Sequence, residues 1–126
     1  MLSLSRAVKI YLASAPMDMR RGHDGLFAVV RSMGLDPFSG HLFAFVGKRG
    51  DRIKILVFER GGFLLLYKRL EKGRFRIPRV PDNGATVALD STELSMLLDG
   101  IDVQRVRRPL LWEPQVARGI DTDRVM

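Results

Sequence analysis

The segment DPFSGHLFAFVGKRGDRIKILVFERGGFLLLYKRLEKGRFRIP, residues 36–78, decides the fold of this chain. Its runs of aromatic, β-branched and other apolar residues are typical of strands, and the Gly-containing stretches between them are typical of turns. The pattern predicts three consecutive antiparallel strands over residues 41–47, 52–59 and 62–70. Lys and Arg crowd the turns and strand ends, so this sheet would carry a fringe of positive charge suited to a polyanion.

Shorter elements are expected on both sides of this meander. They are a strand at 8–13, a helix at 18–33, strands at 74–77 and 85–89, and a helix that begins at Asp90 or Ser91 and runs to residue 98. Asp18 would cap the first helix, and Gly34 would end it. Asp90 or Ser91 would cap the second helix, with Glu93 three residues after Asp90 in a capping-box-like arrangement. Period-two alternation in the meander would put His41, Phe43 and Phe45 on one face of the sheet. The elements predict an α+β domain: an antiparallel sheet, the three-stranded meander plus short flanking strands, with a helix near each end and both helices packed on one face.

The length of 126 residues fits one domain and is too short for two. We expect residues 1–103 to form a single α+β domain. Residues 104–126, where Pro109, Pro114 and Gly119 interrupt the chain, are expected to be a C-terminal tail that is partly disordered or dependent on a partner.

The chain has no feature that would direct it into or across a membrane. No apolar run approaches the roughly 20 residues that a bilayer requires. Arg6 and Lys9 interrupt the N-terminal apolar residues, so a secretory signal is not expected. We therefore expect a cytoplasmic protein with no membrane partner.

The formal net charge of +7 is distributed unevenly along the chain. Residues 20–79 hold 14 Lys or Arg and 5 Asp or Glu, whereas residues 80–126 hold 5 basic and 8 acidic residues. The basic excess thus belongs to the folded middle of the chain, which favours a charged docking surface over a basic arm. A solvated surface that happens to be basic is the alternative.

Basic residues lie beside aromatic ones near the predicted strand ends, an arrangement that would allow phosphate contacts next to base stacking. Most strand phenylalanines are expected in the core, but Tyr67 and Phe75 are interpreted as exposed. Arg20 and Arg21 would open the first helix, where unpaired N–H groups attract anions. The candidate nucleic-acid-binding residues are Arg20, Arg21, Lys48, Arg49, Arg52, Lys54, Tyr67, Lys68, Arg69, Arg74 and Arg76.

The sequence contains no recognisable catalytic constellation. Without cysteine it has no disulfide, thiolate metal site or cysteine nucleophile. His23 and His41 stand apart and lack metal-ligand spacing. Asp18, Asp24, Asp36 and Asp51 could be combined into a magnesium site for nuclease or strand-transfer chemistry, but each has a simpler role in a turn or cap. We expect no enzyme activity, no cofactor and no metal.

Three segments carry a resemblance to a known family: YLASAPMDMRRGHDGL (11–26), DPFSGHLFAFVGKRGDRIKIL (36–56) and GFLLLYKRLEKGRF (62–75). They closely resemble the TnpB-type accessory proteins, the second open-reading-frame proteins of insertion sequence family 66, over about residues 8–78. The resemblance implies a protein of a bacterial mobile element that is required alongside a separate, larger transposase. It supplies no catalytic residues.

Two functional hypotheses follow. In the first, the protein is a non-catalytic transposition factor that binds DNA through its basic surface, with the element ends as a possible target, and associates with the transposase. In the second, it is an adaptor that binds the transposase without contacting DNA. An exposed edge strand could also pair two copies into a homo-oligomer.

Overall fold

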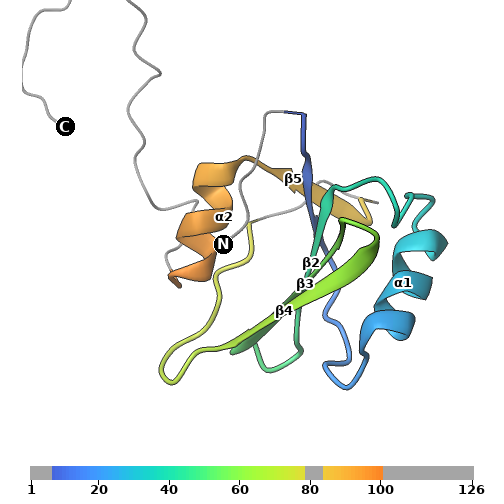
Figure 1. Cartoon of the computed structure of the whole chain (residues 1–126). Helices are drawn as coiled ribbons and strands as arrows, with labels where there is room; N and C mark the ends of the chain where they lie inside the picture. The colour runs from blue at the N-terminus through green and yellow to red at the C-terminus, as the bar shows by residue number, and fades with distance from the viewer. Residues whose placement is uncertain (1–6, 79–83, 101–126) are drawn as a thin grey trace, which may run out of the picture.

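The computed structural model of the chain describes residues 7–78 and 84–100 (Figure 1). The elements are β1 Ile10–Ala13, α1 His23–Ser32, β2 Leu42–Val46, β3 Arg52–Glu59, β4 Gly62–Arg69, β5 Thr86–Leu89 and α2 Ser91–Leu98. The predicted meander is confirmed to within one residue at each strand end. The predicted tail, residues 104–126, lies outside the described residues.

The five strands form one sheet in the order β4-β3-β2-β1-β5. β1 pairs with β2 in parallel, and the other three pairings are antiparallel. The prediction of an antiparallel sheet is therefore wrong in this respect, because the sheet is mixed. The physical reason is that α1 lies between β1 and β2 in the chain and provides the crossover that a parallel pair requires.

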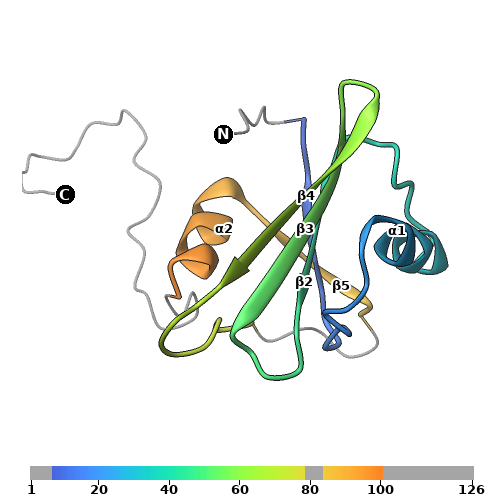
Figure 2. The ribbon, with the colours of Figure 1, turned by 60° about the horizontal axis from the view of Figure 1, so that its bottom comes forward.

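The helices cover opposite faces of the sheet, so the prediction that both pack on one face is wrong. Figure 2 shows the sheet between them, with α1 on one side and α2 on the other. The sequence also predicted a helix near each end of the domain. Only α2, the last described element, has such a place, because α1 follows β1. Two hydrophobic cores result, one on each face.

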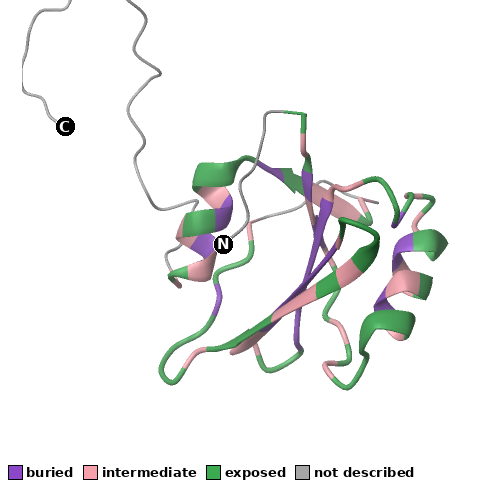
Figure 3. Cartoon of the chain, in the orientation of Figure 1, coloured by how far each residue is buried: buried purple, intermediate pink, exposed green. Residues whose placement is uncertain are grey.

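Period-two alternation in β2 divides its side chains between these two cores. Phe43 and Phe45 pack with α1, whereas Leu42, Ala44 and Val46 pack on the α2 side. Every residue of β2 is buried, and Figure 3 shows the buried residues concentrated in the central strands. A strand covered on both faces has no polar positions, which explains its continuous apolar sequence.

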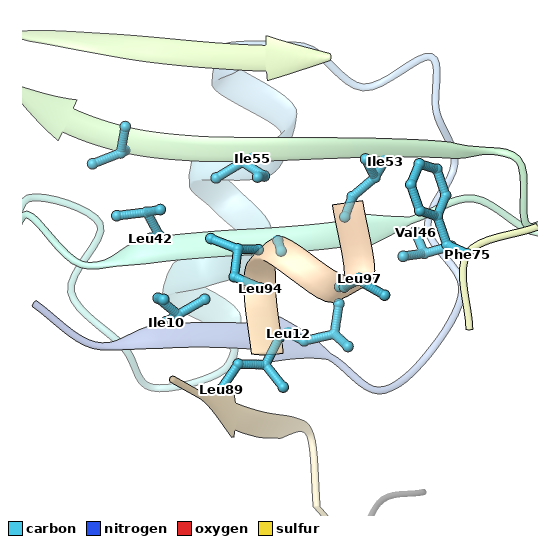
Figure 4. Close-up of a cluster of buried hydrophobic side chains, with 12 residues drawn as sticks. Ile10, Leu12, Leu42, Val46, Ile53, Ile55, Phe75, Leu89, Leu94 and Leu97 are labelled. Atoms are coloured by element: carbon cyan, nitrogen blue, oxygen red, sulfur yellow. The ribbon is translucent and has the colours of Figure 1, made fainter. Parts of the chain in front are cut away.

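The α2-side core explains why the predicted strand at 74–77 does not form. Phe75, expected to be exposed, is buried and packs into this core; Figure 4 shows it beside Val46. Its backbone N–H donates to the carbonyl of Gly50 at 2.7 Å. The segment is therefore a loop that closes one end of the core.

The helix termini confirm one cap and correct another. At α2, Asp90 and Glu93 form the reciprocal capping box, with the Glu93 N–H donating to Asp90 Oδ1 at 2.7 Å. At α1, the helix begins at His23 behind Gly22 instead of at Asp18. The carboxylate of Asp18 is engaged by Arg20 instead, so it does not cap the helix.

The β3–β4 connection is a two-residue hairpin turn, as predicted. Arg60 and Gly61 both have positive φ, 50° and 82°, as a type I′ turn requires. Beyond this hairpin β4 lies at an edge of the described sheet.

None of the described helices is long and apolar enough to cross a bilayer.

The two-core arrangement predicts that both helices contribute to stability. Leu26 of α1 and Leu97 of α2 are each fully buried, in different cores. We expect Leu26→Ala and Leu97→Ala each to lower the free energy of unfolding by about 2–5 kcal/mol, measured by urea denaturation. The control is Leu64→Ala, at an exposed position of β4, which should cost less than about 1 kcal/mol. A cost at only one helix would contradict the two-core fold.

Candidate nucleic-acid interface

Three loops converge at one end of the sheet. They are the β1–α1 loop (residues 14–22), the β2–β3 turn (residues 47–51) and the loop after β4 (residues 70–77), which lie along the lower edge of Figure 1. Because β1 and β2 are parallel, both end at this edge; because β4 is antiparallel to β3, it ends where β3 begins. We call residues 18–21, 47–52 and 67–76 the basic end.

Backbone hydrogen bonds join these loops to one another. The Met17 N–H donates to the carbonyl of Val46 at 2.9 Å, which attaches the first loop to the end of β2. The Leu70 N–H donates to the Asp51 carbonyl at 2.8 Å and so attaches the third loop to the turn. The relative positions of the three loops are thus fixed by the main chain.

Charge is strongly segregated between this end and the other described residues. The basic end contains ten Lys or Arg and three Asp or Glu. The remaining described residues contain four Lys or Arg and six Asp or Glu. Within the described ranges, the positive charge is therefore concentrated where the three loops meet.

Most of the predicted binding residues are exposed at this end. Arg52 is half-buried and Lys54 is buried. The exposed ones are Arg20, Arg21, Lys48, Arg49, Tyr67, Lys68, Arg69, Arg74 and Arg76. Lys72, which is not among the predicted binding residues, is also exposed in the third loop. Its position in the sequence, between the basic residues at 68–69 and those at 74–76, could have identified it as a further candidate for phosphate contact.

Lys54 is a structural residue, which corrects its prediction as a phosphate contact. The residue is only 9% exposed, and its Nζ donates to the carbonyls of Met19 at 2.7 Å and Arg21 at 2.9 Å. The ammonium also lies 5.1 Å from the centre of the Tyr67 ring. Lys54 therefore holds the first loop against β3 and β4, and it is not available to DNA phosphates.

Arg20 and Arg21 lie in the loop before α1, so the prediction that they open the helix is wrong. The guanidinium of Arg20 donates from Nη2 to Asp18 Oδ2 at 2.8 Å and from Nε to Oδ1 at 3.0 Å. These side-chain bonds, together with the Arg20 backbone N–H, hold the pKa of Asp18 well below its usual range. The pair is exposed, so it contributes little to stability and a phosphate can compete for Arg20.

Other basic side chains at this end are partly engaged within the protein. Lys68 Nζ donates to the Leu98 carbonyl at 2.7 Å, at the C-terminal end of α2, where a cation is favoured. Arg69 pairs with Glu71 at 3.1 Å, and both residues are exposed. Neither interaction removes the side chain from solvent.

Arg52 and Arg69 lie directly opposite each other across β3 and β4. Like charges in such a pair repel and destabilise a sheet. Arg52 Nε and Asp51 Oδ1 are buried and have no hydrogen-bond partner among the described residues. A negatively charged ligand beside the two arginines would offset their repulsion.

A pocket of about 360 Å³ opens between the first loop and the β2–β3 turn. Met17, Asp18 and Met19 line it from the loop. The opposite side is lined by residues of the turn and the first residue of β3, namely Gly47, Lys48, Arg49, Asp51 and Arg52. The pocket thus combines thioether side chains with a cationic rim. Gly47 forms part of its wall, and a Cβ there would lie 2.6 Å from the Met19 side chain.

The aspartates of the alternative magnesium site are not grouped in the structure. Among residues 7–78 and 84–100, no group of three or more His, Cys, Asp or Glu side chains is placed to hold a metal ion. Asp18 is bound by Arg20, and Asp24 lies in the first turn of α1.

An aromatic cluster occupies the opposite end of the sheet. Phe38 is 53% exposed, and its ring centroid lies 5.2–5.3 Å from those of Phe27, Phe58 and Phe63. Phe63 also contacts Phe27 and Phe58. The Arg31 guanidinium lies 5.8 Å from the Phe27 ring. This end therefore offers an apolar surface, in contrast to the basic end.

The family model of the IS66 Orf2-like proteins matches residues 8–108 of the chain. The chain belongs to this family. As an IS66 Orf2-like protein, it is an accessory protein of an insertion sequence, and the resemblance seen in the sequence is confirmed. No solved structure matches it.

Two relatives of this IS66 Orf2-like protein come from Sinorhizobium fredii (strain NBRC 101917 / NGR234). The protein y4jC is 38% identical over 115 residues, which span 90% of this chain and 97% of y4jC. The protein y4hO is 34% identical over 115 residues, which span 90% of this chain and 96% of y4hO. Both carry the description uncharacterized protein.

The buried position of Lys54 predicts a stability effect unlike that of its exposed neighbours. Lys54→Met should lower the free energy of unfolding by about 1–3 kcal/mol, because it leaves the Met19 and Arg21 carbonyls without their donor. Lys48→Met, at an exposed turn position, should change it by less than about 0.5 kcal/mol. Equal effects in chemical denaturation would mean that Lys54 does not hold the loop.

Proposed function

We propose that this IS66 Orf2-like protein binds DNA through the basic end of its sheet and serves transposition without catalysing a step itself. The observation that carries the proposal is the convergence of three loops, with ten Lys or Arg against three Asp or Glu, at one end of a molecule whose remaining described residues are net acidic. Cationic side chains gathered in this way release counterions from a phosphate backbone, which is the main source of DNA affinity.

The repulsion within the basic end supports the same proposal. Arg52 and Arg69 are direct cross-strand neighbours, and Lys48 and Arg49 of the β2–β3 turn line the same pocket as Arg52. A protein that needed only a stable sheet would gain from neutral side chains at such positions. DNA phosphates would stabilise the arrangement, so the cost in the free protein would be recovered on binding.

The DNA-binding proposal predicts a salt dependence that comes from one end of the molecule. Lys48, Arg49 and Arg74 are exposed there, and the variant with all three changed to Gln removes three positive charges. The slope of log K against log salt for duplex DNA, measured by fluorescence anisotropy, should fall by about 0.9 for each phosphate that the variant no longer neutralises.

The matched control removes the same charge from the opposite end. Lys9, Arg31 and Arg60 are exposed and lie near the start of β1, the end of α1 and the β3–β4 turn. The triple variant Lys9→Gln, Arg31→Gln, Arg60→Gln should keep the wild-type salt slope. An equal decrease of the slope in both triple variants would mean that net charge, not the basic end, governs binding.

The adaptor hypothesis has an observation of its own, the exposed aromatic cluster around Phe38. Aromatic residues with an exposed apolar surface are characteristic of protein–protein contacts, and the transposase of the same element is the partner we propose for this end. Transposase binding at this end would leave the basic end free for DNA, because the two surfaces lie at opposite ends of the sheet. If the purified protein does not bind DNA at physiological salt, the adaptor role alone stands.

Pairing of two copies through the edge of β4 stays a prediction. β4 has eight residues and lies at an edge of the described sheet, so its outer N–H and C=O groups can accept another strand. Sedimentation equilibrium would report such a dimer directly.

A further inference from the structure

Tyr67 is an exposed aromatic residue in the midst of the basic end. It is 53% exposed, although Phe63 and Leu65 on the same face of β4 pack into the α1-side core. α1 therefore covers the first half of this face of β4 and leaves Tyr67 open. An aromatic ring kept in solvent among cations has a surface available for a flat ligand.

The ring of Tyr67 lies against the side chain of Lys54. The Lys54 ammonium lies 5.1 Å from the ring centre, which is within cation–π range. Lys54 cannot easily move, because its Nζ is bonded to the carbonyls of Met19 and Arg21. The ring thus lies beside a fixed cation while 53% of the residue stays exposed, so binding of a ligand to the ring would cost little conformational entropy.

Phosphate-binding groups flank this ring at a suitable spacing. Arg69 follows two residues along β4 on the same face, and Arg52 lies directly opposite Arg69. Arg52 is thus a diagonal neighbour of Tyr67, on the order of 7–8 Å away. A base stacked on Tyr67 would have its backbone phosphates beside this arginine pair.

We propose that Tyr67 is a stacking platform for an unpaired base, and that the basic end therefore takes single-stranded or locally unpaired DNA in preference to an intact duplex. In a duplex the base faces are already stacked on one another, so a flat ring on a sheet cannot reach them, whereas a single strand offers base and phosphates together. The pocket lined by Met17, Met19 and Arg52 adjoins this surface and offers apolar walls to a neighbouring nucleotide. The inference rests on the proposed DNA binding and specifies the form of DNA.

The test is fluorescence anisotropy with a single-stranded oligonucleotide and the duplex of the same sequence, for the wild type, Tyr67→Leu and Tyr67→Phe. Tyr67→Leu should weaken single-strand binding by about 5- to 100-fold, the range that base–aromatic stacking provides, and should change duplex binding by less than about twofold. Tyr67→Phe keeps the ring and should retain wild-type binding. Because no charge is removed, the salt slope should stay the same in both variants.

Phe38→Leu is the matched control, since Phe38 is equally exposed but lies at the opposite end of the sheet. It should leave both affinities unchanged, and thermal unfolding should show all variants folded. The stacking platform is overturned if Tyr67→Leu leaves single-strand binding intact, or weakens single-strand and duplex binding equally. In that case the proposed function still stands, provided that the wild type binds the duplex. A wild type that binds neither form would overturn both.

Discussion

The parallel pairing of β1 with β2 is the constraint on which the rest of the structure depends. Three residue pairs, from Ile10↔Leu42 to Leu12↔Ala44, join strands that are separated in the chain by α1. Parallel strands end at the same edge, so the loop after β1 must lie beside the β2–β3 turn. The pairing also leaves the other edge of β1 free for β5, which leads into α2 on the opposite face. One set of hydrogen bonds thus sets both cores and the basic end.

The basic end combines two opposing requirements, a high local charge and a fixed shape. Its cations repel one another, most directly at the Arg52–Arg69 pair. Main-chain hydrogen bonds between the loops, the buried side chain of Phe75 and the buried ammonium of Lys54 hold it together. These contacts lie beneath the exposed cations, so the interface can be positively charged at its surface and still be preorganised.

Local sequence patterns predicted the local features of the fold. Alternation in the meander placed Phe43 and Phe45 on one face, and the Asp90 capping box was readable because its partners are three residues apart. The parallel pairing and the opposite placement of the helices could not be read, because both depend on contacts between distant segments. Lys54 and Phe75 were misassigned for the same reason: their burial arises only when remote loops fold over them.

The central claim is that DNA meets the end of the sheet where the three loops converge. The most direct test is NMR chemical-shift mapping of the backbone amides of the 126-residue chain during titration with a DNA oligonucleotide. DNA binding at the basic end should perturb the amides of residues 17–22, 47–52 and 67–76 and leave those of the aromatic cluster around Phe38 unchanged. Perturbations centred on that aromatic cluster, or spread evenly over the sheet, would contradict it.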